Sequence, residues 1–169
     1  MSLIPNFGGG GSGGSINNIF KGLASYASTT SQVLAVAPTS IQFDVATITP
    51  IDVVCTVPSS VITINRTGMY QLTFTIQVGL TGAPPPTGDI FVYVEKNGIA
   101  EPYTTRVLSL PNWPGQYPLS CQWNIAFTVG DTFAINVASQ PNVSTFSALL
   151  PPPPLPIEPS ASINILQIA

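Results

Sequence analysis

Apolar and polar side chains alternate along residues 70–78, and this is the clearest pattern in the chain. The apolar positions are Tyr70, Leu72, Phe74, Ile76 and Val78, and a glutamine or threonine stands at each position between them. Successive side chains of a strand point to opposite faces of a sheet, so the pattern predicts a strand with one buried and one polar face. Residues 62–64 alternate in the same way. We expect a turn at residues 65–68, with Gly68 supplying a positive φ.

The rest of the chain contains further short segments of this kind and no long segment with a helical period. Strands are predicted at residues 32–36, 40–45, 53–57, 90–96, 99–108, 117–128, 132–138 and 161–168, and residues 16–26 offer at most a short helical turn. Strands of this number and length suit two packed antiparallel sheets. The predicted fold is therefore all-β, a jelly-roll sandwich of about eight strands with an extended N-terminal arm. Its predicted core consists of Tyr70, Leu72, Phe74, Ile76, Leu119, Trp123, Ile125, Phe133, Ile135 and Val137.

The connections between the predicted strands are of two kinds. Short turns at residues 65–68, 97–98 and 129–131 alternate with long connections at residues 79–89, 109–116 and 139–160, each of which contains proline. Because consecutive antiparallel strands reverse direction, the short turns should gather at one end of the sandwich with the C-terminus. The long loops should form a stiff crown at the other end. The expected contact residues of this crown are Pro84, Pro85, Pro86, Trp113, Pro152 and Pro153, with Tyr103 and Tyr117 near Trp113 in sequence.

Residues 1–23 are assigned to a glycine-rich arm and residues 24–169 to the jelly-roll domain. Residues 8–15 contain six glycines, a composition that by itself is typical of a flexible linker. The flanking apolar residues have little use in a free tail, so we expect the arm to dock on a neighbouring subunit. The residues expected to anchor it are Leu3, Ile4, Phe7, Ile16, Ile19 and Phe20. A disordered linker is the alternative.

Four segments, in their order along the chain, carry a family resemblance. Residues 62–74 read Ile-x-Ile-x-x-Thr-Gly-x-Tyr-x-Leu-x-Phe, residues 92–98 end in Lys-Asn-Gly, residues 127–133 contain a Gly-Asp turn, and residues 161–165 form a closing strand. Together they resemble the tumour-necrosis-factor/complement-globular-head jelly-roll family over roughly residues 24–169. The resemblance implies this fold and favours a trimer. A single jelly roll with an extended arm also resembles viral capsid subunits, including those at five-fold vertices, for which a pentamer is expected.

Charged residues are scarce, with 4 Lys or Arg and 7 Asp or Glu among 169 residues. A soluble domain normally has far more charge, so we expect other subunits to cover much of the surface. The absence of a basic cluster argues against nucleic acid or an anionic membrane as partner. Residues 1–15 have no basic region followed by an apolar stretch, so we expect no secretion signal of the usual form. Cys55 and Cys121 are accordingly expected to be free thiols.

The chain offers little chemistry for catalysis. Histidine is absent, which excludes Ser-His-Asp and Cys-His arrangements. The seven acidic residues are scattered, and Asp131 is expected to cap its own turn after Gly130. We therefore expect no enzyme activity, no metal site and no cofactor.

These features favour a non-enzymatic structural protein. The expectation is an oligomeric jelly-roll subunit, a trimer or a pentamer, that contacts neighbouring structural proteins in a virion shell, vertex or surface appendage. The alternative is a trimeric binding head that recognises a receptor or glycan through its proline-rich loops, in an extracellular or spore-surface setting.

Overall fold

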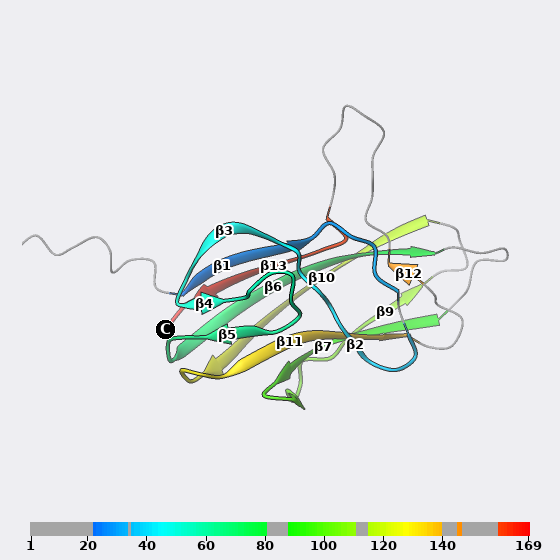
Figure 1. The fold of residues 1–169 in the computed structure, drawn as a ribbon. Coiled ribbons are helices and arrows are strands. Elements are labelled where there is room, and N and C mark those ends of the chain that lie inside the picture. The colour runs from blue at the N-terminus through cyan, green and yellow to red at the C-terminus, as the bar shows by residue number, and fades with distance from the viewer. Residues whose placement is uncertain (1–21, 34, 81–87, 111–114, 140–144, 147–158) are drawn as a thin grey trace, which may run out of the picture.

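The computed structural model describes residues 22–33, 35–80, 88–110, 115–139, 145–146 and 159–169. These residues form two antiparallel sheets and contain no helix, which confirms the predicted all-β sandwich (Figure 1). The first sheet consists of β1 (Leu23–Ser28), β3 (Val45–Ile51), β6 (Gly68–Leu80), β10 (Gly115–Phe127), β12 (Thr145–Phe146) and β13 (Ala161–Gln167). The second sheet consists of β2 (Thr39–Ser40), β4 (Val53–Val54), β5 (Ile62–Ile64), β7 (Gly88–Lys96), β8 (Ile99–Ala100), β9 (Arg106–Leu110) and β11 (Thr132–Ser139).

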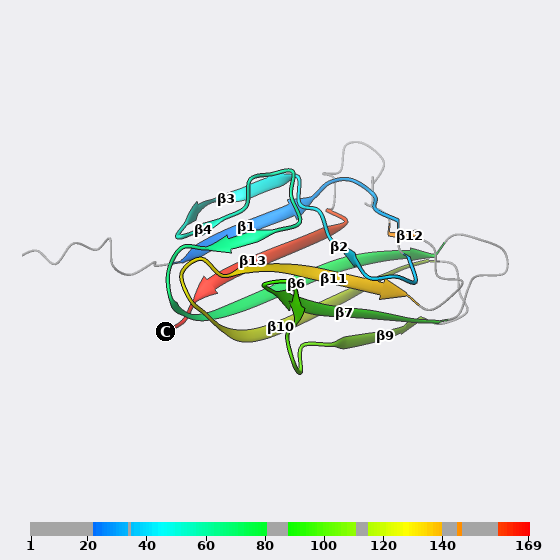
Figure 2. The same cartoon turned by 60° about the horizontal axis from the view of Figure 1, so that its bottom comes forward.

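The strand order of each sheet interleaves segments that are far apart in the sequence. The first sheet has the order β10-β6-β13-β1-β3, with β12 also paired to β6. The second has the order β4-β5-β11-β7-β8, with β2 paired to β11 and β9 to β7. Figure 2 shows the long strands of both sheets running lengthwise through the molecule. β6 is central, because it pairs with β10 from Gly68↔Phe127 to Leu80↔Gly115 and with β13 along its other edge.

The core lies between the two sheets and follows the alternation seen in the sequence. Nine of the ten predicted core residues are buried, and the tenth, Leu119, is partly buried and packs against the others. Trp123 is buried with its polar atom satisfied, since its indole Nε1 donates a hydrogen bond to the Thr104 carbonyl at 2.6 Å. Cys55 and Cys121 are both buried free thiols.

The C-terminus and the strand ends that flank the long connections lie at opposite ends of the sandwich, as the strand directions predict. At the first, here called the turn end, the Met69 amide donates to the Ala169 carbonyl at 2.7 Å, so the C-terminus lies beside the start of β6 (Figure 1). At the other, the loop end, Leu80 pairs with Gly115, Gly88 with Leu110, and Ser139 with Ile90. The strand ends that flank all three proline-containing connections therefore gather at one end, as predicted.

The expectation of a positive φ at Gly68 is wrong. Among the described glycines, positive φ values occur at Gly22, Gly98 and Gly130 instead. Glycine is required at position 68 for a different reason: a Cβ atom there would collide with the Gln167 side chain and the Ala169 carbonyl. The absence of a side chain lets the end of β13 lie against the start of β6.

Between residues 16 and 57 the predicted elements need correction. In the described part of the suggested helical turn, residues 23–26 belong to a strand, β1, which pairs with β13 on one side and β3 on the other. The described residues among 32–36 belong to none of the named strands. The expected strand at residues 40–45 is divided between the two sheets. Ile41 N bonds to Ile135 O of the second sheet and Phe43 bridges to Ser59, whereas β3 of the first sheet begins only at Val45. Of residues 53–57, β4 includes only Val53 and Val54.

A buried tyrosine hydroxyl links the sheets where the chain crosses between them. Tyr26 of β1 donates its hydroxyl to the Val53 carbonyl at 3.3 Å and accepts a hydrogen bond from the Cys55 amide at 3.0 Å. Burial raises the pKa of this phenol. The Tyr26 hydroxyl thus satisfies one backbone group of the short strand β4 and one just beyond it.

Phe74 provides a test of the central strand. Its side chain is fully buried in the middle of β6, so Phe74→Ala should lower the free energy of unfolding by about 3–5 kcal/mol. Thr75→Ala, one position along on the outer face, is the control and should change it by about 1 kcal/mol or less, because it removes only the exposed hydrogen bond between the Thr75 and Ser120 hydroxyls. Urea denaturation followed by tryptophan fluorescence measures both. Equal effects of the two substitutions would contradict the register of β6.

Candidate functional site

The contact residues expected from the sequence lie outside the described residues. This holds for Leu3, Ile4, Phe7, Ile16, Ile19 and Phe20 of the arm and for Pro84, Pro85, Pro86, Trp113, Pro152 and Pro153 of the loops. Of the two tyrosines expected near Trp113, Tyr103 is almost fully exposed and Tyr117 is partly buried against the core. Three other features of the described residues remain as candidates: a polar network, an uncharged sheet face and a cleft beside Tyr103.

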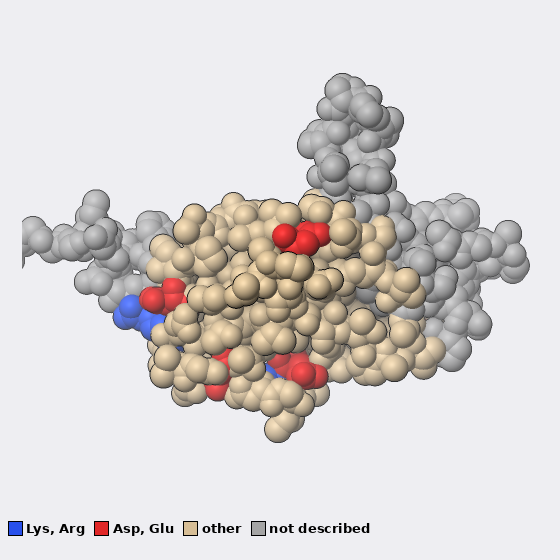
Figure 3. All heavy atoms as spheres, viewed as in Figure 1, with Lys and Arg blue, Asp and Glu red and all other residues tan. Residues whose placement is uncertain are grey.

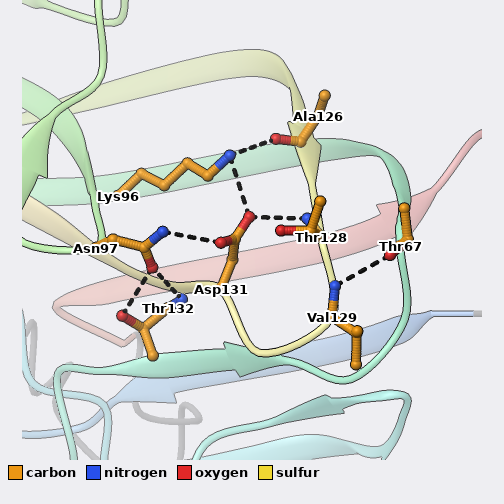
Figure 4. Close-up of polar contacts among 8 residues, drawn as sticks. All are labelled: Thr67, Lys96, Asn97, Ala126, Thr128, Val129, Asp131 and Thr132. Atoms are coloured by element: carbon orange, nitrogen blue, oxygen red, sulfur yellow. Dashed lines mark hydrogen bonds and ion pairs between the residues drawn. The ribbon is translucent and has the colours of Figure 1, made fainter.

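The polar network joins three turns at the turn end (Figure 4). Asp131 lies at its centre: Oδ1 accepts from Asn97 Nδ2 at 2.8 Å, and Oδ2 accepts from the Thr128 amide at 2.7 Å and lies 3.1 Å from Lys96 Nζ. Asn97 Oδ1 accepts from the Thr132 amide at 2.8 Å. Asp131 therefore caps its own turn, as predicted, and also fixes the neighbouring β7–β8 hairpin.

Lys96 and Asp131, the two charged residues of this network, are each held by further contacts. Lys96 Nζ also donates to the Ala126 carbonyl at 2.9 Å and lies 5.2 Å from the centre of the Phe127 ring. Hydrogen bonds from Asn97 and from the Thr128 amide, with a contribution from Lys96, hold the pKa of Asp131 far below its ordinary value. A carboxylate so stabilised in its charged form is a poor proton acceptor at neutral pH. The network is a structural anchor, and the sequence signals Lys96-Asn97-Gly98 and Gly130-Asp131 located its turns.

The first sheet carries no charged residue in any of its strands. Three rows of cross-strand partners cross its outer face from β10 to β3, and cross-strand partners share a face of the sheet. The rows are Ser120, Thr75, Ser162, Ala27 and Val45; Gln122, Thr73, Asn164, Ser25 and Ile48; and Asn124, Gln71, Leu166, Leu23 and Ile51. We call these fifteen residues the uncharged face.

The uncharged face changes character across its width. Amides and hydroxyls dominate on β10 and β6, whereas aliphatic side chains dominate towards β3, where Val45, Ile48 and Ile51 are each exposed. The charged residues among the described residues lie in the second sheet or in connecting segments. Figure 3 shows them from one side as a few separate spots on a largely uncharged surface.

The described residues contain neither a cluster of metal-ligating side chains nor a membrane-spanning helix. No group of three or more Cys, Asp or Glu side chains among them is placed to hold a metal ion. A search of the same residues finds no helix long and apolar enough to cross a membrane.

Comparison with solved structures identifies the class of fold. Two crystal structures of murine APRIL, at pH 5.0 and at pH 8.5, superpose with TM-scores of 0.58 and 0.54, at 11% and 10% sequence identity. Each match covers 87% of this chain and 98% of the other. The chain therefore has a tumour-necrosis-factor-like jelly-roll fold, as the motif order suggested. No protein-family model and no curated protein sequence matches the chain.

Asp131 gives a pH-dependent prediction. Asp131→Asn puts an NH₂ group where one carboxylate oxygen accepts hydrogen bonds, so it should lower the free energy of unfolding by about 1–3 kcal/mol at pH 7. The native pKa of Asp131 is depressed, so its stabilising effect is complete above the ordinary carboxyl pKa of 3.8 and is lost as the pH falls below it. Urea unfolding at pH 7, 5 and 3 should show the difference between variant and wild type shrinking only at pH 3.

Glu101→Gln is the matched control for this experiment. The Glu101 carboxylate has no hydrogen-bond partner among the described residues, so its neutralisation should change the free energy of unfolding by about 0.5 kcal/mol or less. A difference for Asp131→Asn that stayed constant from pH 7 to pH 3 would show that the charge of Asp131 does not stabilise the turn end.

Proposed function

We propose that the protein is a non-enzymatic jelly-roll subunit that self-associates through the uncharged face and contributes to a virion shell, vertex or surface appendage. The observation that carries the proposal is the absence of charge from every strand of the first sheet. The virion setting rests on the composition and on the arm expected at residues 1–23.

The chemistry of the uncharged face suits contact between identical copies. Two copies that meet face to face across a two-fold axis present the same residues to each other, so a charged face would set like charges side by side. Amide and hydroxyl groups avoid this repulsion, because each can both donate and accept a hydrogen bond. Val45, Ile48 and Ile51 add aliphatic surface whose burial favours association.

The alternative, a binding head at an extracellular or spore surface, draws support from the loop end. The strand ends that flank three proline-containing connections gather there, at one pole of the domain. Electron microscopy of the assembled full chain separates the two proposals. A closed shell, an extended appendage or a pentamer supports the structural protein, and a discrete trimer that assembles no further supports the binding head.

A single charge at the centre of the uncharged face tests the self-association. Thr73 lies in the middle row, between Gln122 and Asn164, and is partly exposed. Thr73→Lys would repeat the same positive charge on every copy and bury it in the contact, so the assembly should dissociate. Light scattering coupled to size-exclusion chromatography should then give a mass near one chain, 17.7 kDa, at micromolar concentration.

Thr63→Lys is the matched control, because Thr63 lies at a partly exposed position between two buried residues of β5 in the second sheet. It should leave the assembled mass unchanged. If the face contacts itself, mixing the Thr73→Lys and Thr73→Asp variants should restore association through opposite charges. Assembly of Thr73→Lys at the wild-type mass would refute the proposed role of this face.

Deletion of residues 1–20 tests the expected arm. The first strand, β1, begins at Leu23, so the shortened chain should keep the sandwich and its unfolding midpoint. If the arm docks on a neighbouring subunit, the higher assembly should be lost or reduced in mass. Circular dichroism measures the first outcome and sedimentation velocity the second. An assembly of unchanged mass and stability would favour the disordered linker.

A further inference from the structure

A cleft of about 360 Å³ lies where the open edge of β10 meets the segment between β8 and β9. Its lining comes from two parts of the chain: Glu101, Pro102, Tyr103, Thr104 and Arg106 on one side, and Gln122, Trp123, Asn124 and Ile125 of β10 on the other. The volume is at the lower end of the range for small-molecule sites. The uncharged face includes Gln122 and Asn124 of this lining but none of the residues from the β8–β9 segment.

Hydrogen bonds to buried groups fix the segment between β8 and β9. The side chain of Thr104 is buried, and its hydroxyl accepts from the Val94 amide at 3.1 Å and donates to the Glu101 carbonyl at 2.8 Å. The Thr104 carbonyl accepts from Trp123 Nε1 at 2.6 Å. Arg106 Nη1 donates to the carbonyls of Thr105 and Tyr103 at 3.0 and 3.3 Å. The cleft wall is thus preorganised by hydrogen bonds to buried groups.

Tyr103 is exceptional in two respects. Its side chain is 98% exposed, which makes it the most exposed large hydrophobic residue among the described residues. Its φ is +63°, a left-handed conformation that bulky residues rarely adopt. An asparagine or glycine would take this conformation with less strain, so stability of the segment does not account for a tyrosine here. Strain of this kind is typical of positions that serve binding.

The polar groups of the cleft favour an uncharged, hydroxyl-rich ligand. The carboxylate of Glu101 and the guanidinium of Arg106 have opposite charges, so the lining has no net charge to attract an ion. The side chains of Gln122 and Asn124 form no hydrogen bond with any described residue, and each amide offers both donors and an acceptor. Sugar hydroxyls also donate and accept, and the C–H face of a sugar ring stacks on an aromatic ring. We infer that this cleft binds a neutral saccharide, with one sugar ring stacked on Tyr103.

The inference is tested on the full chain with a panel of methyl glycosides of neutral sugars: glucose, galactose, mannose, fucose and N-acetylglucosamine. Saturation-transfer-difference NMR detects binding, and titration gives the dissociation constant of the sugar that binds best. Tyr103→Ala should weaken this affinity about three- to tenfold, the range expected for loss of an aromatic stacking contact. Tyr103→Phe retains the ring and should bind within about twofold of wild type. Ile99→Ala, at an exposed position of β8 outside the cleft, should have no effect.

Tyr103→Gly distinguishes a binding role from a structural one. It removes the ring and relieves the positive φ, so it should weaken saccharide binding while melting no lower than wild type. Failure of every glycoside to bind the wild type at millimolar concentration would overturn the inference. Equal binding by wild type and Tyr103→Ala would also overturn it. The assembled mass depends on the uncharged face, so neither result bears on the proposed self-association.

Discussion

The pairing of β6 on both of its edges is the constraint on which the rest of the fold depends. Its register with β10 fixes the position of the turn that leads into β11. Its register with β13 fixes the position of the C-terminus, and β13 in turn pairs with β1. Two glycines make this close arrangement possible. A Cβ at Gly68 would meet Gln167 and Ala169, and a Cβ at Gly22 would meet the Tyr70 ring. Both contacts lie at the turn end, where the first and last strands meet β6.

The sequence predicted those elements whose local pattern coincides with their packing. β6 and β10 alternate between apolar and mostly polar residues, and β11 places Phe133, Ile135 and Val137 on one face, so their buried faces were evident. β1 was not, because its inward residues include Ala24 and Ser28 and its outward residues Ser25 and Ala27 are also buried. A strand covered on both faces with small residues has no alternation to detect. The division of residues 40–45 between two sheets was equally hidden, since Ile41 and Phe43 alternate correctly although their backbones bond to different partners.

Of the candidate surfaces, too, one part could be predicted from the sequence and the rest could not. The polar face of β6 was visible in the sequence as a row of glutamines and threonines. Its extension into a five-strand uncharged face depends on which strands become neighbours, and this is a property of the topology. The cleft was harder to predict, because its two walls are some twenty residues apart in the chain and no motif marks either. The positive φ of Tyr103 singles out this position, but it is a property of the folded backbone and could not be read from the sequence.

The charge distribution separates the roles of the two sheets. The ion pair of Lys96 with Asp131 stabilises the turn end, and Arg66 lies 3.6 Å from Asp52 nearby, so charge is concentrated where turns must be fixed. The strands of the first sheet carry no charge, and this is the face that we propose contacts other copies. β10 belongs to both proposed surfaces, since it forms one edge of the uncharged face and one wall of the cleft. An assembly that covers the strands from β6 to β3 but leaves β10 open would display one saccharide site per subunit. Several weak sites held at fixed spacing bind a multivalent glycan surface far more tightly than one, so self-association would itself supply the avidity that a single small cleft lacks.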